Sequence, residues 1–278
     1  MPDITAKEVK ALRDATNVSM MECKKALIEA DGNIEKATKL LREKGMAVAT
    51  KRAAKATNQG KIASAEADGG KTRSLVEVNC ETDFVARNED FIKFVEDLAV
   101  RAVETDEALS ALCNDELMSK VAAIGENLKI RRNVRYMLQG TGAIGSYIHL
   151  GGKVGVLVEL GCTKDETTAA DEFKALLSDL TLHIAACNPR HLKSDEVPAD
   201  VVAAEREIYA KQVEGKPANI VDKIVDGKIN KFYGEICLID QPFVKEPKQS
   251  ITELLAEKGK ALGDTLEIRR FERYQLGV

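Results

Sequence analysis

The chain contains no tryptophan, and aromatic residues make up only 4% of its 278 positions. No apolar run approaches the about 20 residues that a membrane-spanning helix needs, so we expect no contact with a membrane. The N-terminus, Met1-Pro2-Asp3-Ile4, lacks the basic and apolar segments of a secretory signal. We therefore expect a cytoplasmic protein.

Cysteine pairs and a strong charge are missing as well. The six cysteines are widely spaced and form no C-x-x-C motif, which favours free thiols in a reducing cytosol over a disulfide framework. The net charge is −4 with both signs interspersed, so the sequence indicates no strong attraction to nucleic acid. Its composition is otherwise that of an ordinary globular protein, 44% hydrophobic and 31% charged.

Residues 3–45 have the pattern of three short helices. Thr5 and Glu8 have the spacing of a capping box, which Ser19 and Glu22 repeat, and Gly45 predicts the C-terminal end of the third helix. We predict a small domain similar to the ubiquitin-associated fold, which with its linker spans residues 1–55. Two of its methionines, Met20 and Met21, either fill the small core or form an adaptable contact surface.

From residue 56 the chain has an α+β pattern and repeats itself without a gap. Several residues recur 82 positions later: Gly60, Gly69-Gly70-Lys71 and Cys80 correspond to Gly142, Gly151-Gly152-Lys153 and Cys162. We predict a duplicated core, each copy a three-stranded antiparallel sheet with helices, in which the Gly-Gly pair forms a hairpin turn. The predicted subdomains span residues 56–140 and 141–278, and the second contains an inserted helical hairpin at 198–230. We predict that this hairpin turns at Gly215-Lys216-Pro217 and that a strand and loop follow it at 231–244.

Residues 79–87, Asn-Cys-Glu-Thr-Asp-Phe-Val-Ala-Arg, lie between a strand-like and a helix-like run. The tip of this predicted loop, Thr82-Asp83-Phe84-Val85, places apolar side chains beside a carboxylate, which suits insertion into a partner. The second copy has Glu166 in place of Phe84, so the ring is not part of a shared architecture. Phe84 is therefore a candidate functional residue. The alternative is that its ring packs beneath its own loop, since Phe is commonly buried.

Two stretches have patterns associated with nucleotide or metal binding. Residues 65–72, Ala-Glu-Ala-Asp-Gly-Gly-Lys-Thr, match a permissive phosphate-loop pattern, but a strand-like run follows where phosphate binding needs a helix N-terminus. His183, Cys187 and His191 are spaced by four, which could align metal ligands on one helix. Pro189 interrupts that helix and no fourth ligand is evident. We therefore expect no metal and no cofactor.

His149 precedes a predicted hairpin turn, and no nucleophile or carboxylate is placed to make it a catalytic base. Since no other catalytic motif occurs, the sequence indicates a partner-binding protein without chemistry of its own. Two rival classes stay open, a P-loop-like nucleotide-binding enzyme and a generic helical adaptor.

Several stretches resemble the bacterial translation elongation factor Ts family, and the resemblance extends over nearly the whole chain. They are Thr-Asn-Val-Ser-Met-Met-Glu-Cys-Lys-Lys-Ala-Leu at 16–27, Val-Asn-Cys-Glu-Thr-Asp-Phe-Val-Ala-Arg at 78–87, Ile-Gly-Glu-Asn-Leu-Lys-Ile-Arg-Arg at 124–132, Gly234-Glu235 and Gln-Pro-Phe-Val at 241–244.

The resemblance implies a guanine-nucleotide exchange factor that binds elongation factor Tu in its GDP-bound and nucleotide-free states. It implies that Thr82, Asp83, Phe84 and Val85 enter the partner near its Mg²⁺ site and that the Phe ring acts as a wedge, which loosens GDP. Dimer contacts through the helical hairpin, as a homodimer or a 2:2 complex, are implied for some members. The further contact positions that it implies are Met20, Met21, Lys24, Ile124 and His149.

Overall fold

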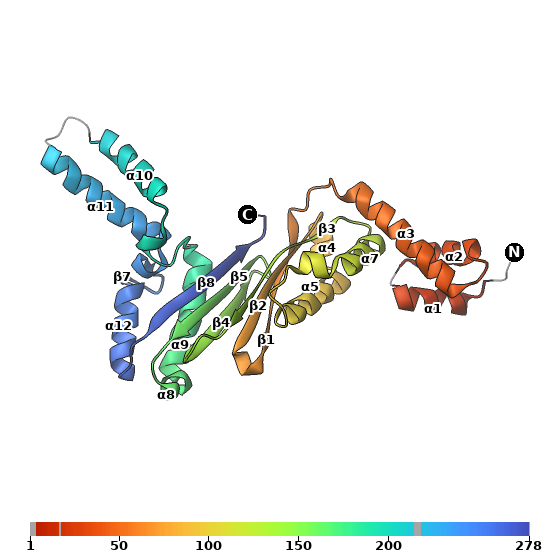
Figure 1. The fold of residues 1–278 in the computed structure, drawn as a ribbon, viewed down its shortest axis with the longest axis horizontal. Helices are drawn as coiled ribbons and strands as arrows, with labels where there is room; N and C mark the ends of the chain where they lie inside the picture. Colours follow the sequence, from red (N-terminus) through yellow and green to blue (C-terminus); the bar gives the residue numbers. More distant parts are fainter. Residues whose placement is uncertain (1–3, 17, 214–217, 278) are drawn as a thin grey trace.

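The computed structural model describes residues 4–16, 18–213 and 218–277. They form an elongated α+β molecule with three helices at the N-terminal end, two small antiparallel sheets in the middle and a helical hairpin at the other end (Figure 1). Within these ranges, no helix is both long enough and apolar enough to cross a membrane.

The N-terminal helices are α1 (Ala6–Thr16), α2 (Met20–Glu29) and α3 (Ile34–Arg52), and they pack around a small core of their own. Both halves of the predicted capping box at Thr5 and Glu8 are present, because each residue accepts a hydrogen bond from the backbone N–H of the other. Only one of the two hydrogen bonds of the predicted capping box at Ser19 and Glu22 is present. Ser19 accepts from the N–H of Glu22, but the Glu22 carboxylate accepts from Lys25 instead, at 2.7 Å.

The prediction that the third helix ends at Gly45 is wrong, because α3 continues to Arg52. Gly45 faces α7 (Asn114–Ile124), where an added Cβ would lie 2.8 Å from the Cβ of Ala122. Glycine at this position permits two helices to approach closely, a role that depends on a neighbour about 75 residues away and not on local backbone conformation.

Two three-stranded antiparallel sheets follow in the described chain. The first has the order β1 (Gln59–Ala67), β2 (Thr72–Cys80), β3 (Leu128–Met137), and the second has β4 (Gly142–His149), β5 (Val154–Gly161), β8 (Glu267–Gln275). The outer face of the first sheet packs on α5 (Glu89–Ala102) and α7, and that of the second on α9 (Asp171–Cys187) and α12 (Ile251–Leu262). The shorter elements are α4 (Asp83–Ala86), α6 (Leu109–Leu112), α8 (Asp165–Ala169), β6 (Pro242–Phe243) and β7 (Glu246–Ser250).

The predicted helical hairpin consists of α10 (Ala199–Lys211) and α11 (Ala218–Ile236), which project from the second sheet (Figure 1). The turn predicted at Gly215-Lys216-Pro217 lies outside the described residues. A strand and loop were predicted to begin at Lys231, which is wrong, since α11 continues to Ile236. Phe232, Tyr233 and Ile236 pack at the base of the hairpin and prolong the helix there.

The inner faces of the two sheets pack against each other. Strand alternation directs Val76 and Val78 of β2 toward the outer helices and Leu75 toward the second sheet. Gly155 of β5 permits this close contact, since a Cβ there would lie 2.8 Å from the Cδ1 of Leu75. The core between the sheets contains Ile62, Leu75, Tyr136, Ile144, Leu157 and Tyr274.

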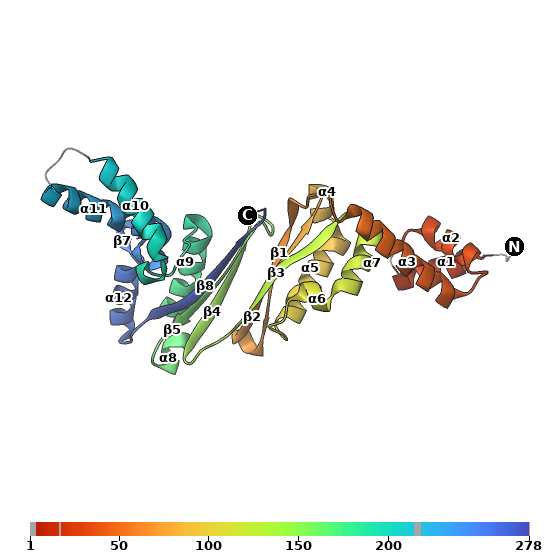
Figure 2. The same cartoon turned by 45° about the horizontal axis from the view of Figure 1, so that its top comes forward.

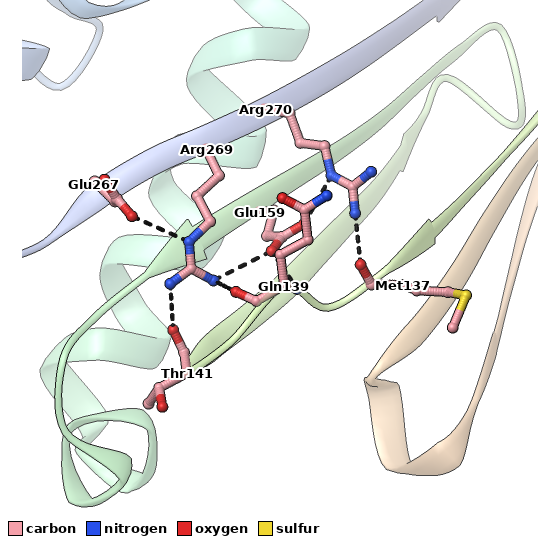
Figure 3. A network of polar contacts seen from close by, with 7 residues as sticks. All are labelled: Met137, Gln139, Thr141, Glu159, Glu267, Arg269 and Arg270. Carbon is pink, nitrogen blue, oxygen red and sulfur yellow. Dashed lines mark hydrogen bonds and ion pairs between the residues drawn. The ribbon is translucent and has the colours of Figure 1, made fainter.

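A buried carboxylate lies on the inner face of each central strand. Glu159 of β5 is fully buried and accepts hydrogen bonds from Arg270 Nε at 2.8 Å and from the backbone N–H of Gln139 at 2.7 Å (Figure 3). Arg269 Nη1 lies 3.3 Å from the same carboxylate and also donates to the Gln139 carbonyl. Three donors therefore satisfy a charge that burial would otherwise strongly disfavour.

Glu77 of β2 has the matching arrangement in the first sheet. It is fully buried and accepts from Arg132 Nε at 2.7 Å and from Arg131 Nη1 at 3.1 Å. Arg132 stacks on Tyr274 of the second sheet, with its Cζ 4.1 Å from the ring centroid. We call the Glu77 and Glu159 networks the crossed clamps, because each has an arginine that stacks on a tyrosine of the other sheet.

The second clamp completes this crossed arrangement. Arg270 stacks on Tyr136 of the first sheet with its Cζ 4.0 Å from the ring centroid, and its Nη2 donates to the Met137 carbonyl at 2.6 Å. Cation–π contacts and charge-assisted hydrogen bonds therefore tie both sheets together in addition to apolar packing.

Candidate partner-binding site

The predicted loop after β2 is a single helical turn that is capped at its start and followed by a second cap. Thr82 is the N-cap of α4, and its Oγ1 accepts a hydrogen bond from the N–H of Val85 at 3.3 Å. Asn88 caps α5 in the same way and accepts from the N–H of Asp90 at 2.9 Å. We call residues 82–87 the α4 turn.

The ring of Phe84 points into solvent, with 82% of its surface exposed. The alternative that it packs beneath its own loop is therefore wrong. Val85 and Ala86 behave differently, because both are partly buried and pack against the core of the first sheet. Val85 is therefore only partly exposed, and its packing anchors the turn that presents Phe84.

The α4 turn and the end of α7 together line a shallow cleft of about 240 Å³. Its lining includes Val85 of the turn together with Lys120 and Ile124, the last residue of α7. Ile124 is partly buried against the same core. The structure thus places Ile124, which the resemblance implies as a contact position, beside the turn.

His149 ends β4, and its Nδ1 lies 2.8 Å from the Tyr147 hydroxyl. The hairpin tip that follows contacts the first sheet, where Ile62 N–H donates to the Gly152 carbonyl at 2.7 Å. β1 pairs near this point with the end of β2 that leads into the α4 turn, Lys61 opposite Val78. The His149 hairpin therefore lies next to the end of the first sheet from which the turn starts.

Met20, Met21 and Lys24 lie exposed on α2. The interpretation that the two methionines fill the small core is therefore wrong. In both views α2 lies at the N-terminal end of the molecule, well away from α4 (Figure 2). The structure does not gather these residues and the α4 turn into one pocket.

The phosphate-loop pattern at 65–72 is a hairpin turn. A short 3₁₀ turn, Asp68–Gly70, joins β1 to β2, with Gly69 at φ 64° and Gly70 at φ 86°. A strand follows it, so the converging N–H groups of a helix N-terminus are missing from this place.

The histidine pattern at 183–191 forms no metal site in the described ranges, where no group of three or more potential ligands occurs. His183 is buried in α9 and both of its ring nitrogens have partners. Nδ1 accepts from the N–H of Val244 at 3.2 Å, so Nε2 donates to Gln241 Oε1 at 2.9 Å. His183 thus fastens the segment around β6 to α9.

This buried histidine predicts a pH dependence of stability. Burial lowers the pKa of His183 below its ordinary value of 6.5. Below pH of about 6.5, the unfolded chain binds a proton here that the folded chain does not, so the free energy of unfolding falls as pH falls. Urea titrations at pH 7.5 and 5.5 should show a larger loss for the wild type than for His183→Gln. Equal losses would contradict the assignment.

A family model described as Elongation factor TS matches residues 81–278, more than half of the chain. The chain belongs to this family. A curated elongation factor Ts from Nitratiruptor sp. is 43% identical over 286 aligned residues, which cover 99% of this chain and 93% of the relative. The elongation factor Ts of Trichlorobacter lovleyi is 42% identical, with 99% and 93% covered. That of Desulfovibrio desulfuricans is 42% identical, with both chains fully covered.

Two carboxylates beside the α4 turn were not singled out from the sequence, although both lie in stretches that resemble the elongation factor Ts family. Glu126 accepts from the Thr82 hydroxyl at 2.7 Å and from the Thr82 N–H at 3.0 Å. Glu81 accepts from the N–H of Asn127 at 2.6 Å and from Arg52 at 2.8 Å. The start of the turn is therefore held by the segment that follows α7.

A signal for Glu126 was present in the sequence of this elongation factor Ts family member. Residues 128–138, Leu-Lys-Ile-Arg-Arg-Asn-Val-Arg-Tyr-Met-Leu, and 266–276, Leu-Glu-Ile-Arg-Arg-Phe-Glu-Arg-Tyr-Gln-Leu, are similar at an offset of 138. The same offset relates Glu126 to Asp264 and the αL cap Gly125 to Gly263. The offset of 82 alone does not reveal it, because the segment with α10 and α11 separates β8 from the other two strands of the second sheet.

Proposed function

We propose that this chain, a guanine-nucleotide exchange factor for elongation factor Tu in translation elongation, acts by inserting its α4 turn beside the Mg²⁺ site of its partner. Family membership supports the partner and the exchange role. The observation that carries the mechanism is the solvent-exposed ring of Phe84 on a turn whose other apolar residues are anchored. Because elongation takes place in the cytoplasm, we also propose that location.

Exchange of this kind requires no bond to be made or broken. A factor that binds nucleotide-free elongation factor Tu more tightly than its GDP form weakens GDP binding by the same factor, since the coupling is reciprocal. Mg²⁺ neutralises phosphate charge and demands near-ideal octahedral geometry. Displacing one of its ligands therefore loosens GDP, and the exchange factor needs neither a catalytic residue nor a cofactor.

We assign a separate task to each residue of the tip. Phe84 is the wedge. Thr82 caps the turn, Val85 anchors it in the core, and Asp83 forms an ion pair with Arg87 at 3.1 Å and adds a carboxylate beside the ring. A rigid turn binds without a large entropy cost, whereas a mobile turn would lose part of the binding free energy when binding orders it.

We propose that the remaining contact positions bind other parts of elongation factor Tu. The exposed Met20 and Met21, with Lys24, form an adaptable surface on α2 that grips the GTPase domain. Ile124 in the cleft beside the turn and His149 at the hairpin tip add contacts closer to Phe84.

We propose a ubiquitin-associated-like domain and linker at 1–55, followed by two duplicated subdomains, the first unit at 56–140 and the second unit at 141–278. The positive φ of 151° at both Gly60 and Gly142, together with the crossed clamps, supports the duplication. The helical hairpin at 198–230 is the proposed surface for a homodimer or a 2:2 complex. We assign no nucleic-acid partner.

Elongation factor Tu loaded with a fluorescent GDP tests this function. We expect the chain to accelerate release of the nucleotide in a saturable manner and to remain bound to the nucleotide-free partner. Binding without acceleration would favour the rival helical adaptor. Retention of labelled GTP or ATP by the chain alone would favour the rival P-loop-like enzyme. Either result would overturn the exchange role.

A further inference from the structure

Glu126 connects the end of α7 to the α4 turn. The helix ends at Gly125 in the left-handed conformation, which reverses the chain and directs the next residue toward β2. Both carboxylate oxygens of Glu126 are used there, since Oε1 accepts from the Thr82 hydroxyl and Oε2 from the Thr82 N–H. The hydroxyl of Thr82 in turn accepts from the N–H of Val85. The N-cap of the turn is therefore held from both sides.

The holding segment is itself fixed. Glu81, the residue before Thr82, accepts from the N–H of Asn127, the residue after Glu126. The two segments therefore bond each other in both directions. Thr82 donates to Glu126, and the next residue, Asn127, donates to Glu81. We call this arrangement, formed by Glu81, Thr82, Glu126 and Asn127, the carboxylate bracket. Charge-assisted hydrogen bonds of this kind are stronger than neutral ones and impose a defined geometry.

We propose that Glu126 is a positioning residue for nucleotide exchange, acting through Phe84. This inference rests on the proposed function of the α4 turn. The turn has only one helical turn of its own backbone hydrogen bonds, which is too little to fix its direction. The bond between Glu126 and Thr82 sets the N-cap, Val85 anchors the opposite side, and the ring of Phe84 between them is held outward.

The second unit provides a matched control for this inference. Asp264 follows Gly263 as Glu126 follows Gly125, and it accepts from the N–H of Lys164 at 3.1 Å and from Thr167 Oγ1 at 2.6 Å. It therefore holds the start of α8. The position that corresponds to Phe84 is Glu166, and no apolar wedge is present there. Loss of the carboxylate, Glu126 or Asp264, should weaken the local structure in either unit, but only the loss of Glu126 should slow nucleotide exchange.

The test compares Glu126→Gln with Asp264→Asn in full-length protein. Stopped-flow release of fluorescent GDP from elongation factor Tu gives the maximal rate at saturating factor and the half-saturating concentration. Since Gln offers one acceptor in place of two, we expect Glu126→Gln to lower the maximal rate about tenfold. The half-saturating concentration should change less than about threefold, because the α2 surface is untouched. Asp264→Asn should leave both quantities unchanged.

Thr82 supplies a second pair of variants should Glu126→Gln fold poorly. Thr82→Val removes the hydroxyl and should lower the rate as Glu126→Gln does, whereas Thr82→Ser keeps the hydroxyl and should lower the rate less than Thr82→Val. A role through Phe84 also requires that Glu126→Gln have no further effect in a Phe84→Ala background.

The outcomes separate the two levels of the proposal. A wild-type rate in Phe84→Ala would overturn the proposed function itself. A slow Phe84→Ala with a wild-type rate in Glu126→Gln and Thr82→Val would overturn only the role of Glu126. Equal losses in Glu126→Gln and Asp264→Asn, or an undiminished effect of Glu126→Gln in the Phe84→Ala background, would show a merely structural role and would also overturn it.

Discussion

Phe84→Ala should slow the release of GDP from elongation factor Tu by about 30-fold or more at a fixed concentration of the factor, without loss of stability. Truncating an aromatic anchor of an interface typically costs about 2–4 kcal/mol, and about 2 kcal/mol corresponds to a factor of about 30. The ring is 82% exposed, so its removal leaves no cavity and should change the free energy of unfolding by less than about 0.5 kcal/mol.

The second unit again provides the control for this variant. Glu166 is exposed at the corresponding position of α8, and Glu166→Ala should change neither the exchange rate nor the stability. Phe84→Leu keeps part of the apolar volume and should give an intermediate rate. A folded Phe84→Ala variant that releases GDP at the wild-type rate would remove the wedge from the mechanism.

Glu159→Gln should lower the free energy of unfolding by about 3–5 kcal/mol, the largest stability effect that we expect from a single polar substitution. The carboxylate is fully buried, and the arginines that bond it are largely buried as well. The side chain of Arg269 is 16% exposed and that of Arg270 is 31% exposed. Without the carboxylate both guanidinium groups keep their desolvation cost, Arg270 loses its counter-charge and Arg269 keeps only the exposed Glu267. Urea titrations monitored by circular dichroism measure the difference.

Glu267→Gln is the control, because Glu267 bonds the same Arg269 at 3.1 Å but is 66% exposed. Exposed ion pairs contribute little, so we expect a change below about 0.5 kcal/mol. Glu77→Gln should behave like Glu159→Gln, since Glu77 is equally buried beside Arg131 and Arg132. A loss below about 1 kcal/mol for both buried positions would contradict the assignment of the crossed clamps as the lock between the sheets.

Much of the fold could be predicted because it rests on local patterns. The capping residue Thr5 and the glycine pairs in the hairpin turns each act within a few residues of sequence. Gly45 could not be interpreted in this way, because its role depends on Ala122 in another helix. The end of α11 was misjudged because residues 231–236 owe their helical state to packing at the base of the hairpin.

The candidate site likewise has a part that could be predicted from the sequence and a part that could not. Phe84 could be singled out because the offset of 82 aligns it with Glu166 and so separates it from shared architecture. Its supports could not, since Glu126 and Thr82 are 44 positions apart and meet only in the folded chain. The offset of 138 identifies Glu126 and Asp264 as corresponding positions, but the sequence does not show which groups their carboxylates bond.

The Mg²⁺ dependence of the Phe84 effect tests the central claim most directly. GDP release from elongation factor Tu is measured with the wild type and with Phe84→Ala, first in millimolar Mg²⁺ and then after chelation of the metal. If the ring acts by disturbing the metal site, the large difference between the two proteins in Mg²⁺ should nearly vanish once the metal is removed. A difference of the same size in both conditions would contradict that claim.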